Sequence, residues 1–142
     1  MKIKIKKLDP KAVIPTRGSD AAAGVDLHAP KALVIHPNSN GVVSTGLAVE
    51  IPDGYFGAIF ARSGMATRKG LRPANCVGVI DSDYRGEIKV VLHNDSDIIR
   101  PVQERDRVAQ LVILPYEPIE FDEVDELNDT DRGIGGFGST GN

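Results

Sequence analysis

The sequence predicts an all-β fold: a sandwich, jelly roll or barrel of about eight to ten short strands. Several runs alternate large apolar residues with polar ones, which is the period of a strand with one buried face. Clusters of Pro, Gly, Asn and Asp separate these runs at fairly regular spacing. Only one short segment carries the start and stop signals of a helix.

Length and composition indicate one soluble globular domain. The chain has 142 residues, of which 41% are hydrophobic and 26% are charged, which are ordinary values for such a domain. It has 17 Lys and Arg against 20 Asp and Glu, a net charge of −3. Because there is no basic excess, binding of long nucleic acid is disfavoured. A small phosphorylated ligand needs only a few focused cations and stays compatible with this composition.

Cysteine usage and hydropathy suggest a compartment. The single Cys76 excludes an internal disulfide and a multi-cysteine metal site, and we expect it to be a small buried thiol. Residues 1–6 lack the apolar run of a signal peptide. No window approaches the roughly 18 apolar residues of a membrane span. These features predict a cytoplasmic protein that does not associate with membranes.

Six strands are predicted before the helix. In the first, Ile3 and Ile5 alternate with lysines. The segment 52–54, Pro-Asp-Gly, is a strong turn signal before the last. Gly57 within that last strand indicates a bulge or a close approach of another segment. The predicted ranges are 3–6, 25–29, 33–35, 42–45, 47–51 and 55–60.

One helix and three further strands follow. Ser63 is a suitable N-cap, residues 64–68 fill the helix, and Gly70 ends it. The strands that resume after the helix are predicted over 77–80, 88–93 and 108–114.

The segment 78–92 is interpreted as a β-hairpin that turns through residues 81–83, Asp-Ser-Asp. Such a hairpin would bring a carboxylate, a flat ring and a cation to one tip, as a small-molecule site requires. The side chains concerned are Asp81, Asp83, Tyr84 and Arg85. Acidic turn residues also bond their own backbone, so the turn alone leaves a purely structural role open.

The composition changes after Pro115, which predicts a folded part over 1–115 and a tail over 116–142. The tail begins as an acidic linker and ends in a glycine-rich arm from Arg132 onward. Glycine-rich backbone loses much entropy on ordering, so we expect the arm to be mobile on its own. A frayed end is one interpretation. Arg132, Phe137 and the segment 138–140, Gly-Ser-Thr, favour a lid that closes over a nucleotide.

Taken together, these segments resemble the trimeric dUTP pyrophosphatase (dUTPase) family over nearly the whole chain. Five motifs occur in the family's order, and they lie at 23–27, 61–66, 75–87, 106–111 and 132–140. Each motif alone is weak, whereas all five in order are very specific. Two residues depart from the family pattern: Val25 stands where an aromatic is common, and Arg105 where Gly is usual.

The resemblance implies a jelly-roll subunit with one short helix, assembled as a homotrimer with three sites at the subunit boundaries. It implies Mg²⁺-assisted hydrolysis of dUTP to dUMP and pyrophosphate, which supplies dUMP for thymidylate synthesis and keeps uracil out of DNA. Asp81 is then the base that activates the attacking water, since an exposed aspartate is ionised at neutral pH. The alternative for Asp81 is a carboxylate that caps a turn.

The resemblance also assigns residues to the inner phosphates and the metal. Asp26 would hold Mg²⁺ through water, with the ion mainly on the triphosphate; a structural loop residue is the alternative. Backbone N–H groups of Ser63 and Gly64 would point at a phosphate. Arg62 and Gln110 would contact the inner phosphates, although Arg62 could equally serve subunit contacts.

The base, the sugar and the outer phosphate have their own candidates. The uracil edge would pair with backbone groups and one side-chain amide, contributed by Asn75, Gly78, Val79, Ile80 and Lys89. Tyr84 would lie under the deoxyribose, and Phe137 would stack on uracil. The arm would hold the γ-phosphate through Arg132, Gly138, Ser139 and Thr140.

Three rival interpretations stay open at this point. The dCTP deaminase family has Arg-Ser-Ser where this chain has Arg62, Ser63 and Gly64, and it needs a Glu where Val91 stands. A non-catalytic jelly-roll module would explain the strands but not the motifs. A dUTPase that has become a signalling protein would keep the same residues.

Overall fold

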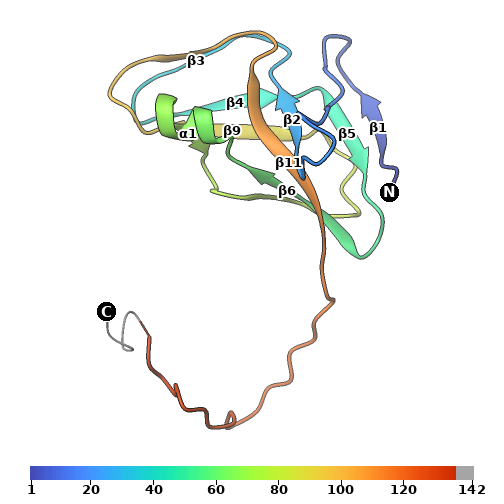
Figure 1. Cartoon of the computed structure of the whole chain (residues 1–142), viewed down its shortest axis with the longest axis vertical. Coiled ribbons are helices and arrows are strands. Elements are labelled where there is room, and N and C mark those ends of the chain that lie inside the picture. Colours follow the sequence, from blue (N-terminus) through green and yellow to red (C-terminus); the bar gives the residue numbers. More distant parts are fainter. Residues whose placement is uncertain (137–142) are drawn as a thin grey trace.

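The computed structural model describes residues 1–136 and contains eleven β-strands and one α-helix (Figure 1). In chain order these are β1 (Lys4–Lys7), β2 (Val25–His28), β3 (Leu33–Ile35), β4 (Asn40–Ser44), β5 (Leu47–Glu50), β6 (Tyr55–Phe60), α1 (Ser63–Lys69), β7 (Leu71–Pro73), β8 (Gly78–Ile80), β9 (Lys89–Asn94), β10 (Arg100–Val102) and β11 (Arg107–Pro115). The predicted all-β jelly-roll class with one short helix is confirmed.

The strands form four antiparallel sheets. The largest has the order β2-β11-β6-β8, a second has the order β4-β9-β7, and β1 pairs with β5 while β10 pairs with β3. In Figure 1, β4 and β9 run across the view and β11 runs steeply down it. Sequence neighbours are therefore often not sheet neighbours, and most of the fold depends on pairing between distant segments.

A single apolar core joins these sheets, and the register of β4 on β9 shows how. Val43 faces Val90 in the ladder, and each is 2% exposed, whereas the adjacent pair of Val42 and Val91 is 55% and 36% exposed. This is the two-residue period that the sequence displays. The same core takes in Met65 from α1, so the helix is packed against the sheets.

Two strands were missed by the sequence analysis, and each contains a proline. β7 includes Pro73 and pairs only with β9 at the edge of its sheet. β10 includes Pro101, which lies opposite Val34 in a two-stranded pair. Proline lacks the N–H that a ladder needs and is tolerated at an edge. The prediction that clusters containing proline separate the strands therefore fails at Pro101, which lies within β10.

The predicted hairpin over residues 78–92 is also wrong. β8 pairs with β6 in the four-stranded sheet, whereas β9 pairs with β4 and β7 in the three-stranded sheet. Residues 81–88, here called the crossover, carry the chain from one sheet to the other. The apolar runs on either side of the turn signal do form strands, but an apolar run does not specify the partner of a strand.

Two local predictions at the helix and the cysteine have different outcomes. Gly70 ends α1 in the left-handed conformation, with φ 64° and ψ 27°, as predicted. Ser63 is not the N-cap: the cap position is Arg62, which has an extended backbone and no side-chain capping bond. Cys76 is exposed, with φ 63°, so the expected buried thiol was wrong.

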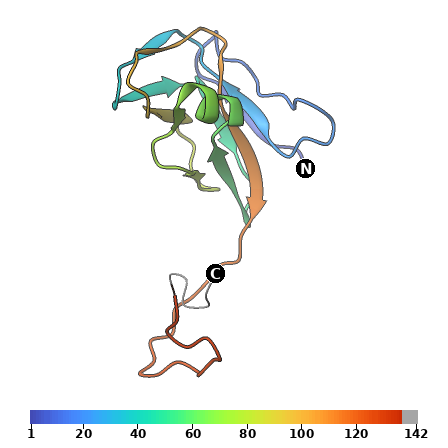
Figure 2. The same ribbon diagram turned by 60° about the vertical axis from the view of Figure 1, so that its left-hand side comes forward.

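After β11 the chain leaves the body of the molecule. Residues 116–136 contain no helix or strand and extend away from the sheets (Figures 1 and 2). Large apolar side chains are nevertheless exposed along them, Phe121 by 92% and Leu127 by 88%. Within residues 1–136, no helix has the length and hydropathy of a membrane-crossing segment.

Gly57 lies at a close approach between sheet and core, one of the two possibilities that the sequence left open. A Cβ at this position would stand 3.0 Å from Cδ1 of both Ile51 and Leu111, and 3.2 Å from Cβ of Ile80. These distances are shorter than ordinary van der Waals contact, so a side chain at Gly57 would force its neighbours to shift.

We therefore predict that Gly57→Ala lowers the free energy of unfolding by about 1–3 kcal/mol through overpacking. Urea unfolding followed by circular dichroism measures this change. Gly18→Ala is the matched control, since a Cβ there meets nothing within 4 Å. Equal stability of the two variants would contradict the overpacking argument.

Candidate functional site

Residues 75–88, which connect β7 to β9, carry most of the residues predicted to bind the base and activate water. β7 and β9 pair with each other, so Asn75 and Lys89 stand at the two ends of one loop. β8 lies within this loop and pairs with β6. The Asn75 amide lies against Gly78, where an added Cβ would be 3.4 Å from its nitrogen.

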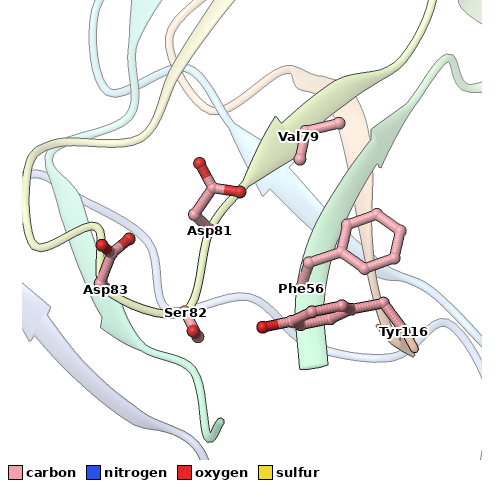
Figure 3. A pocket seen from close by; sticks show the side chains of 6 residues that line it. All are labelled: Phe56, Val79, Asp81, Ser82, Asp83 and Tyr116. Carbon is pink, nitrogen blue, oxygen red and sulfur yellow. The ribbon is translucent and has the colours of Figure 1, made fainter. Parts of the chain in front are cut away.

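A cavity of about 600 Å³ opens where β8 ends (Figure 3). It is lined by Phe56, Val79, Asp81, Ser82, Asp83 and Tyr116. The rings of Phe56 and Tyr116 meet edge to face, with centroids 6.5 Å apart and planes at 71°. Figure 3 shows Asp81 and Asp83 on one side of the cavity and the two rings on the other. The cavity thus combines an acidic edge with an apolar wall.

The aromatic wall was missed by the sequence analysis. Phe56 stands near the start of β6, and Tyr116 follows the end of β11. The antiparallel register sets Tyr55 opposite Pro115, so these two chain positions meet at one end of the sheet. No local signal in the sequence reports a register between segments about sixty residues apart. The signal available in the sequence was Tyr116, an aromatic residue just after the predicted strand 108–114.

The crossover is braced by its own hydrogen bonds. The Tyr84 hydroxyl donates to the carbonyl of Glu87 at 3.0 Å, and the Tyr84 backbone N–H donates to the carbonyl of Asp81 at 3.2 Å. The Arg85 guanidinium donates to the carbonyl of Ser82 at 2.6 Å. Tyr84 as a whole residue is 43% exposed and is not part of the apolar core, so it is available to a ligand.

A second pocket, of about 510 Å³, is basic and lies where β6 ends, next to the start of α1. It brings together five predicted residues, namely Asp26, Arg62, Ser63, Gly64 and Gln110. Arg68 and Arg107 also line it and were missed. Arg107 falls inside the fourth family motif, which was the signal available for it. Three guanidinium groups against one carboxylate make this pocket suited to phosphate.

The Asp26 carboxylate is shared by two of these arginines. Arg62 Nε donates to one carboxylate oxygen at 2.7 Å, and an Arg107 guanidinium nitrogen donates to the other at 3.3 Å. The side chains of Asp26 and Arg62 are only 17% and 25% exposed. Ion pairs with limited access to water are screened weakly, so the Asp26–Arg62 pair is strong. Arg107 is 54% exposed, and its pair with Asp26 is the weaker of the two.

Gln110 is fixed by the loops on either side of it. Its amide nitrogen donates to the carbonyl of Ala61 at 2.9 Å. Its amide oxygen lies beside Gly24, where an added Cβ would be 2.8 Å away. A side chain at position 24 would displace the Gln110 amide, and the Gln110 side chain connects the first and second motifs.

His28 pairs in the β2–β11 ladder with Arg107, which lines this pocket. Burial lowers the pKa of its imidazole, Arg107 and Arg62 lower that pKa further, and Asp26 opposes them. Its Nδ1 atom is buried without a hydrogen-bond partner among residues 1–136. At neutral pH His28 therefore adds no positive charge to the pocket.

The side chains do not fit a metal ion that is bound directly by the protein. In the part of the chain that the structure describes, no three His, Cys, Asp or Glu residues cluster as metal ligands. Asp26 is the single carboxylate of the basic pocket, and both its oxygens accept bonds from arginines. A Mg²⁺ ion that keeps its waters and rests on substrate phosphates requires no such cluster.

The arm is described as far as residue 136. Arg132 is exposed, and its Nε donates to the carbonyl of Gly135 at 2.9 Å. The N–H of Gly133, which has φ 50°, donates to the carbonyl of Thr130 at 3.0 Å and closes a turn. The other predicted arm residues, Phe137, Gly138, Ser139 and Thr140, lie outside the described residues.

The two pockets lie at opposite ends of the β6–β11 ladder. At one end Tyr55 pairs with Pro115, next to the cavity that contains Asp81. At the other end Phe60 pairs with Gln110, which lines the basic pocket. Six paired residues in a strand span about 17 Å, and the two pockets share no lining residue. Within one chain, Asp81 and the basic pocket are therefore separate.

Comparisons with known proteins agree on one family. Residues 10–141 match the dUTPase family model. A deoxyuridine 5'-triphosphate nucleotidohydrolase of Nautilia profundicola is 50% identical, covering 99% of both chains. One from Corynebacterium glutamicum is 49% identical and covers 98% of this chain and 94% of its own.

Solved structures show the same fold. The dUTPase of Staphylococcus bacteriophage 80α, determined with dUpNHpp, superposes with a TM-score of 0.91 at 28% identity, over 99% of this chain and 98% of that one. A D95N mutant of the dUTPase from phage φ11 of S. aureus, described as coordinating a structural Mg(II) ion, has a TM-score of 0.80 at 28% identity. That match covers 89% of this chain and 98% of the other.

We predict that Asp26→Asn lowers the free energy of unfolding by roughly 1–3 kcal/mol, because charge-assisted bonds to two arginines are weakened. Glu104→Gln is the matched control, since its ion pair with Lys11 is exposed and should contribute at most about 1 kcal/mol. Urea unfolding of both variants measures the difference. A loss no larger in Asp26→Asn than in the control would show that Asp26 does not hold the pocket together.

Proposed function

The chain belongs to the dUTPase family, and from this premise we propose that it hydrolyses dUTP to dUMP and pyrophosphate, with Asp81 as general base. The observation that carries the proposal is the position of Asp81. Its carboxylate is exposed at the end of β8, beside a cavity large enough for a ligand. Removing dUTP would keep uracil out of DNA, and the dUMP would serve thymidylate synthesis.

The reaction follows from the chemistry of the α-phosphorus. Asp81 orients a water molecule and accepts its proton as the water oxygen attacks that phosphorus. A new P–O bond forms, and the bond to the oxygen that bridges the α- and β-phosphorus breaks. Pyrophosphate leaves with the electron pair, and dUMP remains.

The basic pocket supplies the phosphate contacts in this proposal. Arg62 and Gln110 contact the inner phosphates, and backbone N–H groups of Ser63 and Gly64 donate to phosphate oxygens. Arg107 adds positive charge and shares Asp26 with Arg62. Mg²⁺ would be carried by the triphosphate, whose charge it neutralises, with Asp26 reaching it at most through water.

Base and sugar selection are assigned to the loop between β7 and β9. Backbone groups from Gly78 to Lys89, including Val79 and Ile80, pair with the uracil edge together with the Asn75 amide. Cytosine carries an amino group where uracil has a carbonyl, so it would leave buried groups unpaired. The Tyr84 ring lies under the deoxyribose and excludes a 2'-hydroxyl.

A homotrimer with composite sites accounts for the separation of the two pockets. The acidic cavity and the basic pocket stand at opposite ends of one strand pair, so one nucleotide can meet both only if they come from different subunits. The opposite signs of charge of the two pockets also suit such a boundary. We propose that Asp81 of one subunit faces Arg62 of another.

The tail provides independent support for assembly. Exposed apolar side chains such as Phe121 and Leu127 alternate with acidic residues along it. A largely apolar pocket of about 440 Å³, which includes Ile3 and Ile5, lies beside the lysine-bearing edge strand β1. Charge and hydropathy therefore match between the tail of one subunit and the body of another. This supports a division into a body, 1–115, and an exchanged tail, 116–142.

The end of the tail is proposed to be the lid of the site. Arg132, Gly138, Ser139 and Thr140 would bind the γ-phosphate, and Phe137 would stack on uracil. Closure would exclude water that is not positioned for attack and complete the phosphate contacts.

Pyrophosphate release in the presence of Mg²⁺, measured with dUTP beside dTTP, dCTP and UTP, tests the proposed function. We expect fast release from dUTP alone. Release from all four nucleotides would overturn the account of base and sugar selection. Binding of dUTP without release would favour a binding module instead of an enzyme.

Subunit mixing tests the composite site. Asp81→Asn is expected to bind dUTP but to lose about 10²- to 10⁴-fold in turnover, because the general base is removed. Arg62→Ala is expected to lose phosphate binding. Trimers coexpressed from both variants should regain activity, since some sites then combine an intact Asp81 with an intact Arg62. Failure to regain any activity would place both residues in one subunit's site.

Truncation before Arg132 tests the lid. We expect unchanged folding, because residues 116–136 do not contribute to the core, and a loss of turnover greater than about tenfold. Thermal unfolding and dUTP turnover of the truncated and full-length chains measure the two effects. Normal turnover in the truncated chain would exclude a role for the arm.

A further inference from the structure

Glu87 connects the Tyr84 ring to the body of the protein. Its backbone carbonyl accepts the hydrogen bond from the Tyr84 hydroxyl at 3.0 Å. Its side-chain Oε1 accepts a hydrogen bond from the backbone N–H of Gly46 at 2.9 Å, in a partly buried position. Gly46 belongs to the turn between β4 and β5, so one residue joins the ring to a turn far away in the sequence.

The turn that contains Gly46, whose N–H donates to the Glu87 side chain, is closely packed. Gly46 has φ 69°, and an added Cβ there would stand 2.7 Å from Cβ of Asp9 and 2.9 Å from Cβ of Ala12. Its carbonyl accepts a bond from the N–H of Leu8 at 2.7 Å. The Gly46 N–H is therefore held at a defined place and direction.

The residue after Glu87 is anchored to the same turn. The fully buried Thr45 hydroxyl donates to the carbonyl of Ile88 at 2.7 Å, and the Ile88 N–H donates to the carbonyl of Leu47 at 2.8 Å. The bonds of Tyr84 and Arg85, by contrast, end within the crossover. The attachment of the crossover to the body thus begins at Glu87.

The Tyr84 ring is confined on a second side by Gly86. An added Cβ at Gly86 would overlap the phenol, with ring atom Cε2 only 2.9 Å away. The ring therefore lies on the Gly86 backbone while its hydroxyl is tied to Glu87. A shift of Glu87 would carry the ring with it.

We propose that Glu87 is a positioning residue that fixes the Tyr84 ring and thereby sets the preference for deoxyribose over ribose; this inference rests on the function proposed above. Steric rejection of a 2'-hydroxyl works only if the excluding ring cannot yield. The peptide whose carbonyl holds the ring is anchored through the Ile88 N–H and through the Glu87 side chain. Loss of the bond from Glu87 to Gly46 removes one of these two anchors and lets the ring shift enough to admit the extra hydroxyl.

The test compares Glu87→Ala with Glu87→Gln. We expect Glu87→Ala to lower the ratio of kcat/KM for dUTP to kcat/KM for UTP by about tenfold. Glu87→Gln should keep the ratio of the unmodified protein, because its amide oxygen can accept the same bond from Gly46. Glu104→Ala, which removes an exposed glutamate elsewhere, is the matched control and should leave the ratio unchanged.

The outcomes separate this inference from the proposed function. If the unmodified protein prefers dUTP and Glu87→Ala retains that preference, the positioning role is overturned while the proposed function stands. If the unmodified protein releases no pyrophosphate from dUTP, the proposed function falls, and this inference falls with it.

Thermal unfolding shows whether Glu87→Ala folds. If it does not fold, a second variant, Tyr84→Phe, tests the same proposal. Tyr84→Phe keeps the ring and removes the bond to the Glu87 carbonyl, so it must lower the same ratio. An unchanged ratio in Tyr84→Phe would overturn the proposal without any need for the Ala variant.

Discussion

The pairing of β6 with β11 is the interaction on which the rest of the structure depends. These strands form the longest continuous ladder, from the pair of Phe60 and Gln110 to the pair of Tyr55 and Pro115. One end of the ladder carries the basic pocket and the other carries the cavity beside Asp81. Because backbone hydrogen bonds fix the length of the ladder, they also fix the separation of the two pockets.

The separation of the two pockets bears on why the proposed trimer would be needed. An acidic edge beside the reacting atoms and a basic pocket for phosphates would weaken each other if they lay together in one chain, because opposite charges in contact neutralise one another, as Asp26 does for Arg62 and Arg107. Placing them at opposite ends of a strand pair keeps both sets of charges available. In the proposed trimer the two pockets meet across a subunit boundary, and substrate would lie between them.

The crossover shows a second way in which the fold supports the site. Asp81 and Tyr84 stand on a segment with few attachments of its own, and its far end is bound to the turn at Thr45 and Gly46. An exposed loop can present reactive side chains accurately only if such bonds hold it. Thr45 and Glu87 supply these bonds, although neither is among the residues predicted to touch substrate.

The sequence alone determined the local features. Alternation located most strands, Gly70 marked the end of α1, and the five motifs named the family, because all of these depend on neighbouring residues or on a fixed order of residues. The tertiary structure decided what each strand pairs with: it moved β8 and β9 into different sheets, admitted the proline-containing edges β7 and β10, and brought Phe56 to Tyr116 and Glu87 to Gly46. Pairing and register between distant segments arise from the packing of the whole core, and no short stretch of sequence encodes them.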